Sequence, residues 1–155
     1  SKPHVVGIVG AVGDLLQPGA VEPHPRTFTR EEAEGLLPEV DRLLGQAQTL
    51  RARLGTAEQA AQSEQWTVRS NGKVHPEATA ETAETTRRTV ARQLRALLER
   101  LQGLGIVVRD VESGLIDFPS VRDGRIIHLC WRRGEPLEIR WWHEVAAGFA
   151  GRQPL

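Results

Sequence analysis

The sequence has little cysteine, no excess charge and no long apolar run, and each shortage excludes a class of protein. Cys130 is the single cysteine in 155 residues, so the chain contains no internal disulfide and no Cys-x-x-Cys motif for zinc or redox chemistry. Twenty basic residues balance twenty acidic ones, and a formal net charge of zero argues against a nucleic-acid partner. No apolar run approaches the roughly 18 residues of a membrane span, which argues against a membrane partner.

The rest of the composition is typical of a soluble globular protein with one domain. Hydrophobic residues make up 39% of the chain and charged residues 26%. A chain of 155 residues is long enough to bury its own core without disulfides or a structural metal. Because the first residues do not have the layout of a signal peptide, we expect a cytoplasmic protein.

The pattern of residue types divides the chain into two parts. Residues 1–26 contain a stretch of small apolar residues followed by a proline-rich linker, which predicts an N-terminal arm. The glycine spacing in this arm differs from that of a dinucleotide-binding loop, and its apolar stretch is suited to adding a strand to a sheet edge. Residues 27–155 are expected to form a single domain in which long helices precede short strands.

Two segments with helical periodicity follow the arm. The first begins at Thr29, an N-cap whose capping box is completed by Glu32, and Pro38 predicts a kink or a restart of this helix. Turn-forming residues over 65–78 separate the segments, so we expect an antiparallel helical hairpin, and apolar surface beyond the reach of the strands favours a homodimer. In both segments the apolar residues alternate between spacings of three and four, a heptad pattern, at Leu36, Val40, Leu43, Ala47, Leu50 and Leu54 and at Val90, Leu94, Leu97, Leu101 and Leu104.

The C-terminal part alternates apolar and polar residues with a period of two, which is typical of strands. Asp123-Gly124 is a strong signal for a two-residue hairpin turn. The predicted fold class is therefore α+β, with a long antiparallel helical hairpin packed on a small antiparallel sheet of three or four strands. We expect these strands over residues 106–110, 115–120, 125–131 and 137–143.

The Asp123-Gly124 turn also predicts which side chains share a face of the sheet. It sets Asp117 opposite Cys130, and we expect the next hairpin to set Leu129 opposite Ile139. This register assigns to the core face Ile116, Phe118, Ile127, Leu129, Trp131, Leu137, Ile139 and Trp141. It assigns to the opposite face Asp117, His128, Cys130, Glu138, Arg140 and Trp142.

The second face carries the residue types of a metal site or an acid–base site. A divalent transition metal would be bound by carboxylate, imidazole and thiolate groups, for which the candidates are Asp117, His128, Cys130 and His143. The candidates for acid–base chemistry are Asp117, Glu135, His143 and Glu144. The alternative is a solvated face with cross-strand ion pairs, on which Cys130 is a small buried hydrophobic residue.

Several runs in this part are similar to those of the domain-of-unknown-function 2203 family, a family of small uncharacterised bacterial proteins. They are Gly114-Leu115-Ile116-Asp117-Phe118-Pro119, Leu129-Cys130-Trp131-Arg132-Arg133-Gly134-Glu135, Trp142-His143-Glu144 and Gly148-Phe149-Ala150-Gly151-Arg152. The resemblance extends from about residue 27 to the end and implies no established activity. It favours a site built from Asp117, Cys130, Glu135 and His143, without a requirement for His128. In the predicted register, however, His143 points to the core, so it meets Asp117 only if the fourth strand twists or bulges or the loop at Glu135 folds over.

The function predicted from the sequence is a small interaction or regulatory module that self-associates through its hairpin. Long heptad seams and several tryptophans near one sheet favour this prediction, with a second protein as a further partner. The residues that we expect at its contact surfaces are Trp131, Trp142, Phe149 and Arg152, with Phe149 anchoring the C-terminal tail on the sheet and Arg152 binding Asp117 or Glu135. The alternative is a small metal-dependent or acid–base enzyme that uses the Cys, His and carboxylate groups.

Overall fold

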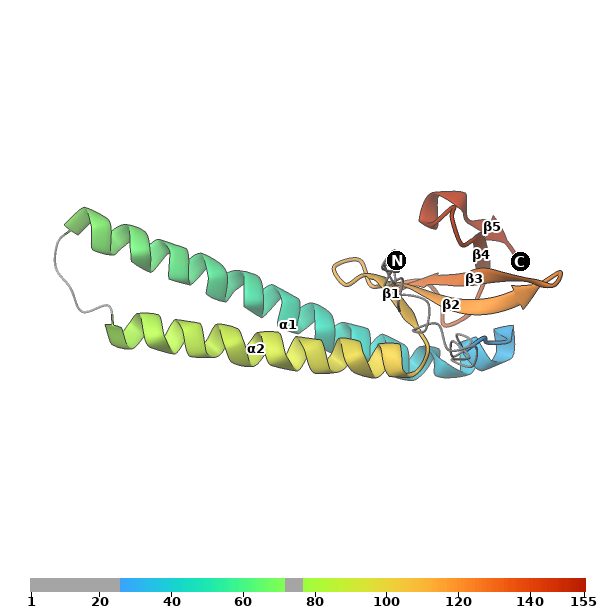
Figure 1. Ribbon diagram of the computed structural model, residues 1–155, viewed down its shortest axis with the longest axis horizontal. Coiled ribbons are helices and arrows are strands. Elements are labelled where there is room, and N and C mark those ends of the chain that lie inside the picture. Colours follow the sequence, from blue (N-terminus) through green and yellow to red (C-terminus); the bar gives the residue numbers. More distant parts are fainter. Residues whose placement is uncertain (1–25, 72–76) are drawn as a thin grey trace, which may run out of the picture.

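A helical hairpin and a sheet make up the computed structural model, which describes residues 26–71 and 77–155 (Figure 1). The predicted arm, residues 1–26, lies outside the described residues except for Arg26. In chain order the elements are α1 (Arg30–Asn71), α2 (Glu77–Gly103), β1 (Val107–Asp110), β2 (Leu115–Arg122), β3 (Arg125–Arg132), β4 (Trp141–Glu144), the 3-10 turn η1 (Phe149–Gly151) and β5 (Gln153–Pro154). The α+β prediction is confirmed. No helix of the described part is both long and apolar enough to span a membrane.

The capping box at the start of α1 is confirmed. The backbone N–H of Glu32 donates to Oγ1 of Thr29 at 3.1 Å, and the N–H of Thr29 donates to Oε2 of Glu32 at 3.4 Å. The helix continues through Pro38 without a restart, which corrects that part of the prediction. Pro38 is exposed, and at such a position water can solvate the carbonyl that the missing proline N–H leaves unpaired.

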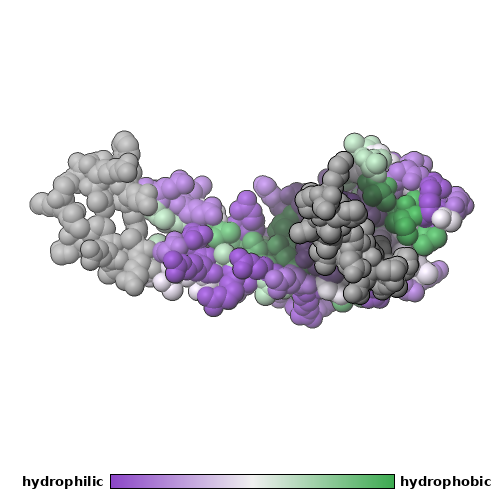
Figure 2. All heavy atoms as spheres, in the orientation of Figure 1, coloured by the Kyte–Doolittle hydropathy of each residue, from purple (hydrophilic) through white to green (hydrophobic). Residues whose placement is uncertain are grey.

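The connection between the helices is shorter than predicted. We expected a loop over 65–78, but α1 runs to Asn71 and α2 begins at Glu77. No glycine or proline lies between Gln65 and Ser70, so nothing in that stretch ends the helix before Gly72. The two helices lie antiparallel and side by side, and their outer halves extend beyond the sheet (Figure 1). On the face that Figure 2 shows, polar side chains cover much of the coloured part of the hairpin, with apolar ones between them near the middle of the molecule.

The sheet has five antiparallel strands in sequential order, one more than the largest number predicted. The register of β2 and β3 is confirmed, with Asp117 opposite Cys130. Asp123 and Gly124 have φ angles of 50° and 74°, as a type I′ hairpin turn requires. The fifth strand is the short C-terminal β5, which pairs with β4.

The predicted register of the fourth strand was wrong. Leu129 pairs with Trp142 and not with Ile139, so the strand is displaced by three residues. An odd displacement exchanges the faces of a strand, and Trp142 therefore lies in the core, whereas Trp141 lies on the opposite face. Leu137, predicted in the core, is 53% exposed.

The cause of the displacement is the segment between β3 and β4. Gly134 has a φ of 100°, and Pro136 has no N–H to donate to a strand ladder. This segment forms a longer loop, to which Nε1 of Trp131 is tied by a hydrogen bond of 2.9 Å to the carbonyl oxygen of Pro136. One face of the sheet packs on the helices to form the core, which includes Leu37, Leu101, Phe118 and Trp131. The other face carries the side chains described next.

Candidate metal centre

Three neighbouring strands bring Asp117, His128 and His143 together on the face of the sheet opposite the helices. The shifted register of β4 pairs His143 with His128, and their rings contact edge to face with centroids 5.4 Å apart. One potential ligand atom from each residue lies within 4.8 Å of those from the other two. The displacement by three residues therefore removes the predicted separation of His143 from Asp117.

The carboxylate of Asp117 is the centre of this cluster. Oδ1 lies 2.9 Å from Nε2 of His143, and Oδ2 lies 3.2 Å from Nδ1 of His128. Oδ2 also accepts a hydrogen bond of 2.7 Å from Nε of Arg109. Asp117 and His143 are each only 1% exposed, so these contacts are made almost without water.

Burial and hydrogen bonding act in opposite directions on Asp117. Burial is the largest single influence and by itself would raise the pKa of this carboxyl. Hydrogen bonds from His128, Arg109 and His143 together outweigh burial and lower the pKa to about 2. Asp117 is therefore a buried carboxylate that is ionised at neutral pH, which is the form that binds metals.

The protons of His143 are defined by its surroundings. Nδ1 lies 2.7 Å from the carbonyl oxygen of Glu144, which can only accept, so Nδ1 carries a proton. On the other side of the ring, Nε2 faces an ionised carboxylate oxygen that can also only accept. At this distance either a hydrogen bond from Nε2 of His143 or a cation shared by the two atoms satisfies Oδ1 of Asp117.

Nδ1 of His128 has two neighbours that assign it opposite hydrogen-bonding roles. Its Nδ1 lies 3.0 Å from Nη2 of Arg109, which can only donate, and 3.2 Å from Oδ2 of Asp117, which can only accept. One nitrogen cannot accept from the first and donate to the second at the same time. Either contact is satisfied only at the expense of the other.

Arg109 is the member of the cluster that the sequence analysis missed. It lies in β1, next to a register irregularity between Val108 and Asp110, and its guanidinium contacts both Asp117 and His128. Val107, two residues before Arg109, pairs with Asp117, and residues two apart in a strand face the same side, so Arg109 is expected on the face of Asp117. The register shift between Val108 and Asp110 leaves Arg109 without an opposite residue, so the pairing pattern does not reveal its neighbours.

The predicted ligand Cys130 lies outside the set of converging atoms. It is 1% exposed, and burial together with the charge of Asp117 raises the pKa of its thiol to about 12. Its burial and its place outside the converging atoms match the small buried hydrophobic residue of the alternative prediction.

The two predicted glutamates are held elsewhere by arginines. Glu135 accepts two hydrogen bonds from Arg152, at 2.7 and 2.9 Å, which is one of the two pairings expected for that arginine. Glu144 forms an ion pair with Arg125. Of the four acid–base candidates, the structure therefore brings only Asp117 and His143 together.

The residues predicted at contact surfaces are mostly buried. Trp131 is 0% and Trp142 6% exposed, and both belong to the core. The tail docks on the sheet as predicted, but through β5 and Arg152, because Phe149 remains 41% exposed and is not a buried anchor.

A cavity of about 330 Å³ opens beside the cluster. Asp117, His143 and Arg109 line one side of it. The opposite wall is formed largely by the turn after β4, residues 145–149, whose side chains are apolar. The cluster therefore has one side that a small molecule can approach.

Comparison with protein families gives a match that covers all the described residues. The family model described as "Uncharacterized conserved protein (DUF2203)" matches residues 26–155, which confirms the resemblance found in the sequence. Searches of curated proteins and of solved structures gave no match.

Proposed function

Because the chain belongs to the DUF2203 family, whose description states no activity, we propose a function from the geometry alone: the protein is a small metal-dependent enzyme. Its divalent transition metal binds to Asp117, His128 and His143. The observation that carries the proposal is the convergence of these three buried side chains, with one potential ligand atom of each within 4.8 Å of the other two. Nδ1 of His128 and the carboxylate of Asp117 both offer lone pairs, as ligands of such an ion have to.

The distances support an ion of this class. Two ligands that each bond one metal at about 2.1 Å lie about 3.0 Å apart at a right angle and about 3.4 Å apart at the tetrahedral angle of zinc. The contacts of Asp117 with the two histidines, 2.9 and 3.2 Å, are near the shorter of these values. Two imidazoles and one carboxylate suit zinc or iron, and hard cations such as magnesium prefer an all-oxygen site.

The surroundings of the three ligands support a catalytic role. Nδ1 of His143 donates to a backbone carbonyl, the contact that commonly orients a metal-bound histidine. Three protein ligands leave at least one coordination position open, and two of the three, Asp117 and His143, line the cavity. A metal with an open position activates a bound water or polarises a substrate oxygen.

Metal binding can be measured directly. The chain is stripped with a chelator, reconstituted with Co²⁺ or Zn²⁺ and analysed for metal content and for the visible absorption of bound Co²⁺. We expect one ion per chain and its loss in Asp117→Asn and in His143→Gln. Glu144→Gln, which alters a neighbouring carboxylate paired with Arg125, is the control that retains the ion.

Thermal melts of the same variants separate loss of ligands from loss of fold. A folded wild-type chain that takes up no ion after reconstitution contradicts the proposal. The same holds if Asp117→Asn is folded and retains the ion, because the carboxylate is then not a ligand.

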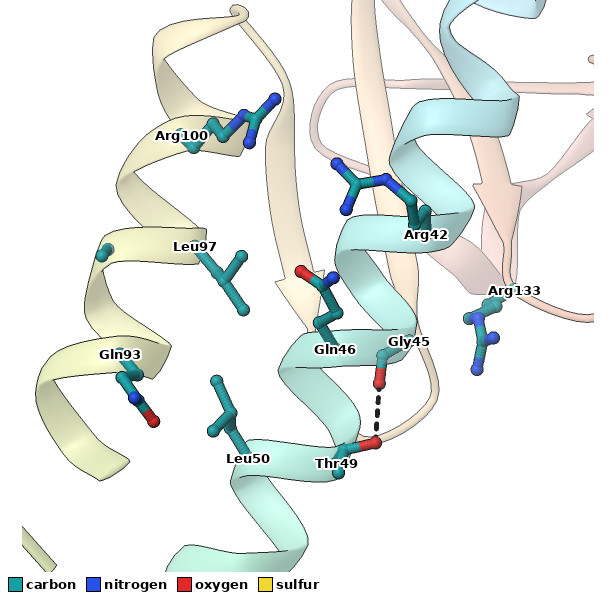
Figure 3. Close-up of a pocket in the computed structure, with 10 residues that line it drawn as sticks. Arg42, Gly45, Gln46, Thr49, Leu50, Gln93, Leu97, Arg100 and Arg133 are labelled. Carbon is teal, nitrogen blue, oxygen red and sulfur yellow. Dashed lines mark hydrogen bonds between the residues drawn. The ribbon is translucent and has the colours of Figure 1, made fainter. Parts of the chain in front are cut away.

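A groove on the hairpin favours a second candidate function, self-association. A groove of about 890 Å³ lies between α1 and α2, and Leu50 and Leu97 point into it from the two helices (Figure 3). Both leucines belong to the heptad seams and remain partly exposed. The hairpin of a second copy would extend this seam into a bundle of four helices around a two-fold axis.

The solution mass tests the second candidate. We expect a dimer in the wild type and a monomer in Ala96→Glu, which places a charge in the groove. Gln102→Glu introduces the same charge on α2 at an exposed residue outside the groove and is expected to leave the dimer intact. A wild-type monomer at high micromolar concentration contradicts self-association and leaves the metal proposal untouched.

A further inference from the structure

We propose that the cavity beside the metal centre binds a small organic carboxylate with an apolar body as the substrate. This inference rests on the proposed metal centre and specifies what approaches its open side. Three observations lead to it: the charge balance of the site, the position of Arg109 and the apolar wall of the cavity.

The charges of the site do not balance once a metal is bound. Asp117 contributes one negative charge and Arg109 one positive charge, so the cluster with neutral histidines is close to neutral. A divalent ion adds two positive charges, and Asp117 is the only acidic residue among the described residues that line the cavity. An excess of positive charge in a partly buried site favours an anionic ligand at the open position.

Arg109 is placed to bind the same anion as the metal. Its Nε and Nη2 contact Asp117 and His128, and no hydrogen bond of Nη1 is found within residues 26–71 and 77–155. Nη2 carries two hydrogens, of which at most one faces Nδ1 of His128, so the other is available beside Nη1. The side chain is 40% exposed and lines the cavity, so its guanidinium can hold a carboxylate as two parallel donors.

The remaining wall of the cavity determines the kind of anion. It consists of Leu115, Val145, two alanines, Gly148 and Phe149, which offer no side-chain hydrogen-bond donor to the body of a ligand. Val145 and Phe149 are 50% and 41% exposed, so a ligand in the cavity would cover apolar surface that water now contacts. At about 330 Å³ the cavity is at the small end of the range of about 300–1,000 Å³ for ligand pockets.

A carboxylate fits this wall better than inorganic phosphate does. Phosphate is hydrophilic on every side and carries more charge, and Arg109 is the only cationic side chain among the described residues that line the cavity. A carboxylate places one charged edge between metal and Arg109 and turns an apolar body to the wall. Both anions can offer charged oxygens to a metal and to Arg109, so their affinities have to be compared by titration.

The test uses the full chain loaded with Co²⁺ and four probes: benzoate, its neutral isostere benzamide, isobutyrate and inorganic phosphate. Calorimetry gives the affinities, and a change in the visible Co²⁺ spectrum shows whether the probe reaches the metal. We expect saturable binding of benzoate that changes the spectrum, with binding of benzamide weaker by about tenfold or more. Removal of the metal is expected to weaken benzoate binding by at least the same factor.

Two variants assign the binding to this cavity. Arg109→Gln is expected to retain Co²⁺ and to bind benzoate about tenfold more weakly. Arg140→Gln, which changes an arginine paired with Glu138 outside the cavity, is expected to bind benzoate as the wild type does.

The outcomes separate the two proposals. A chain that binds Co²⁺ but binds benzoate no better than benzamide overturns the carboxylate inference alone. Phosphate binding tighter than benzoate overturns it too, in favour of a phosphate site. A chain that binds no metal overturns the proposed function, and the inference that rests on it.

Discussion

Asp117 keeps a negative charge at a position where only 1% of its surface is exposed. Three partners make this favourable, and each comes from a different strand: Arg109 from β1, His128 from β3 and His143 from β4. The sequence supplies the residue types, but the site depends on where each strand sets its side chains. Arg109 was missed for this reason, whereas Asp117, His128 and His143 were predicted from their chemistry.

Loss of the Asp117 charge is expected to destabilise the metal-free chain. Asparagine keeps the shape of the side chain but leaves Arg109 and the protonated side of His143 without a counter-charge. We expect Asp117→Asn to lower the free energy of unfolding by about 2 kcal/mol, less than for a fully buried pair because Arg109 is partly exposed. Urea unfolding in the presence of a chelator measures this, and an unchanged midpoint would show that the cluster does not stabilise the fold.

Two glycines with positive φ are expected to differ in how well they tolerate substitution. Gly114 has a φ of 69°, and a Cβ there would lie 2.5 Å from Cβ of Arg133. Gly124 has a φ of 74°, but a Cβ there would meet no atom within 4 Å apart from its chain neighbours. Asparagine tolerates a positive φ, so Gly124→Asn is expected to cost less than about 1 kcal/mol and Gly114→Asn about 2 kcal/mol or more. Similar unfolding midpoints for the two variants would contradict the steric explanation.

The two hairpins of the sheet show how far an element can be predicted from its residues. Asp123-Gly124 determines its own turn, because both residues adopt a positive φ readily, and the pairing of β2 with β3 follows from it. The connection between β3 and β4 has no such short-range signal. Gly134 and Pro136 indicate a break in pairing but not its length, and an error of three residues was enough to place Trp141 and Trp142 on the wrong faces.

The last strand is held by a side-chain pair whose stability depends on pH. Burial raises the pKa of Glu135, but hydrogen bonds from Arg152 and from the backbone N–H of Arg132 outweigh it and lower that pKa below 4.5. A lowered pKa in the folded state means that the contribution is complete above 4.5 and is lost as the pH falls through the lowered value.

Comparison with Glu135→Gln isolates this contribution. We expect the wild type to be more stable than this variant by about 1–2 kcal/mol at neutral pH, with a difference that shrinks as the pH falls below 4.5. Urea unfolding across the pH range measures it. Glu138→Gln, which alters an exposed ion pair, serves as the control with a small difference throughout. If the stability difference between the wild type and Glu135→Gln did not change with pH, the charge of Glu135 would not be what holds the tail.

At the scale of the whole molecule, the candidate metal ligands and the groove lie on different surfaces. The helices cover one face of the sheet near the base of the hairpin, and the metal-ligand cluster lies on the other face, while the groove between α1 and α2 lies along the hairpin. The capping box and the heptad spacing made the hairpin predictable, because helical signals are local. The side chains that meet on the other face were only partly predictable, because the register of β4 and the position of Arg109 depend on contacts between distant strands.

Metal binding should therefore stabilise the molecule through the sheet alone. A ligand that binds only the folded state raises the free energy of unfolding by about 2.7 kcal/mol at a free concentration of about 100 times its dissociation constant. We expect Zn²⁺ or Co²⁺ to raise the melting temperature of the wild type and of the groove variant Ala96→Glu by similar amounts. Mg²⁺, which prefers oxygen ligands, and His143→Gln, which lacks one imidazole, are expected to give no increase. Thermal unfolding followed by circular dichroism measures each shift, and an equal rise in His143→Gln would place the ion elsewhere on the chain.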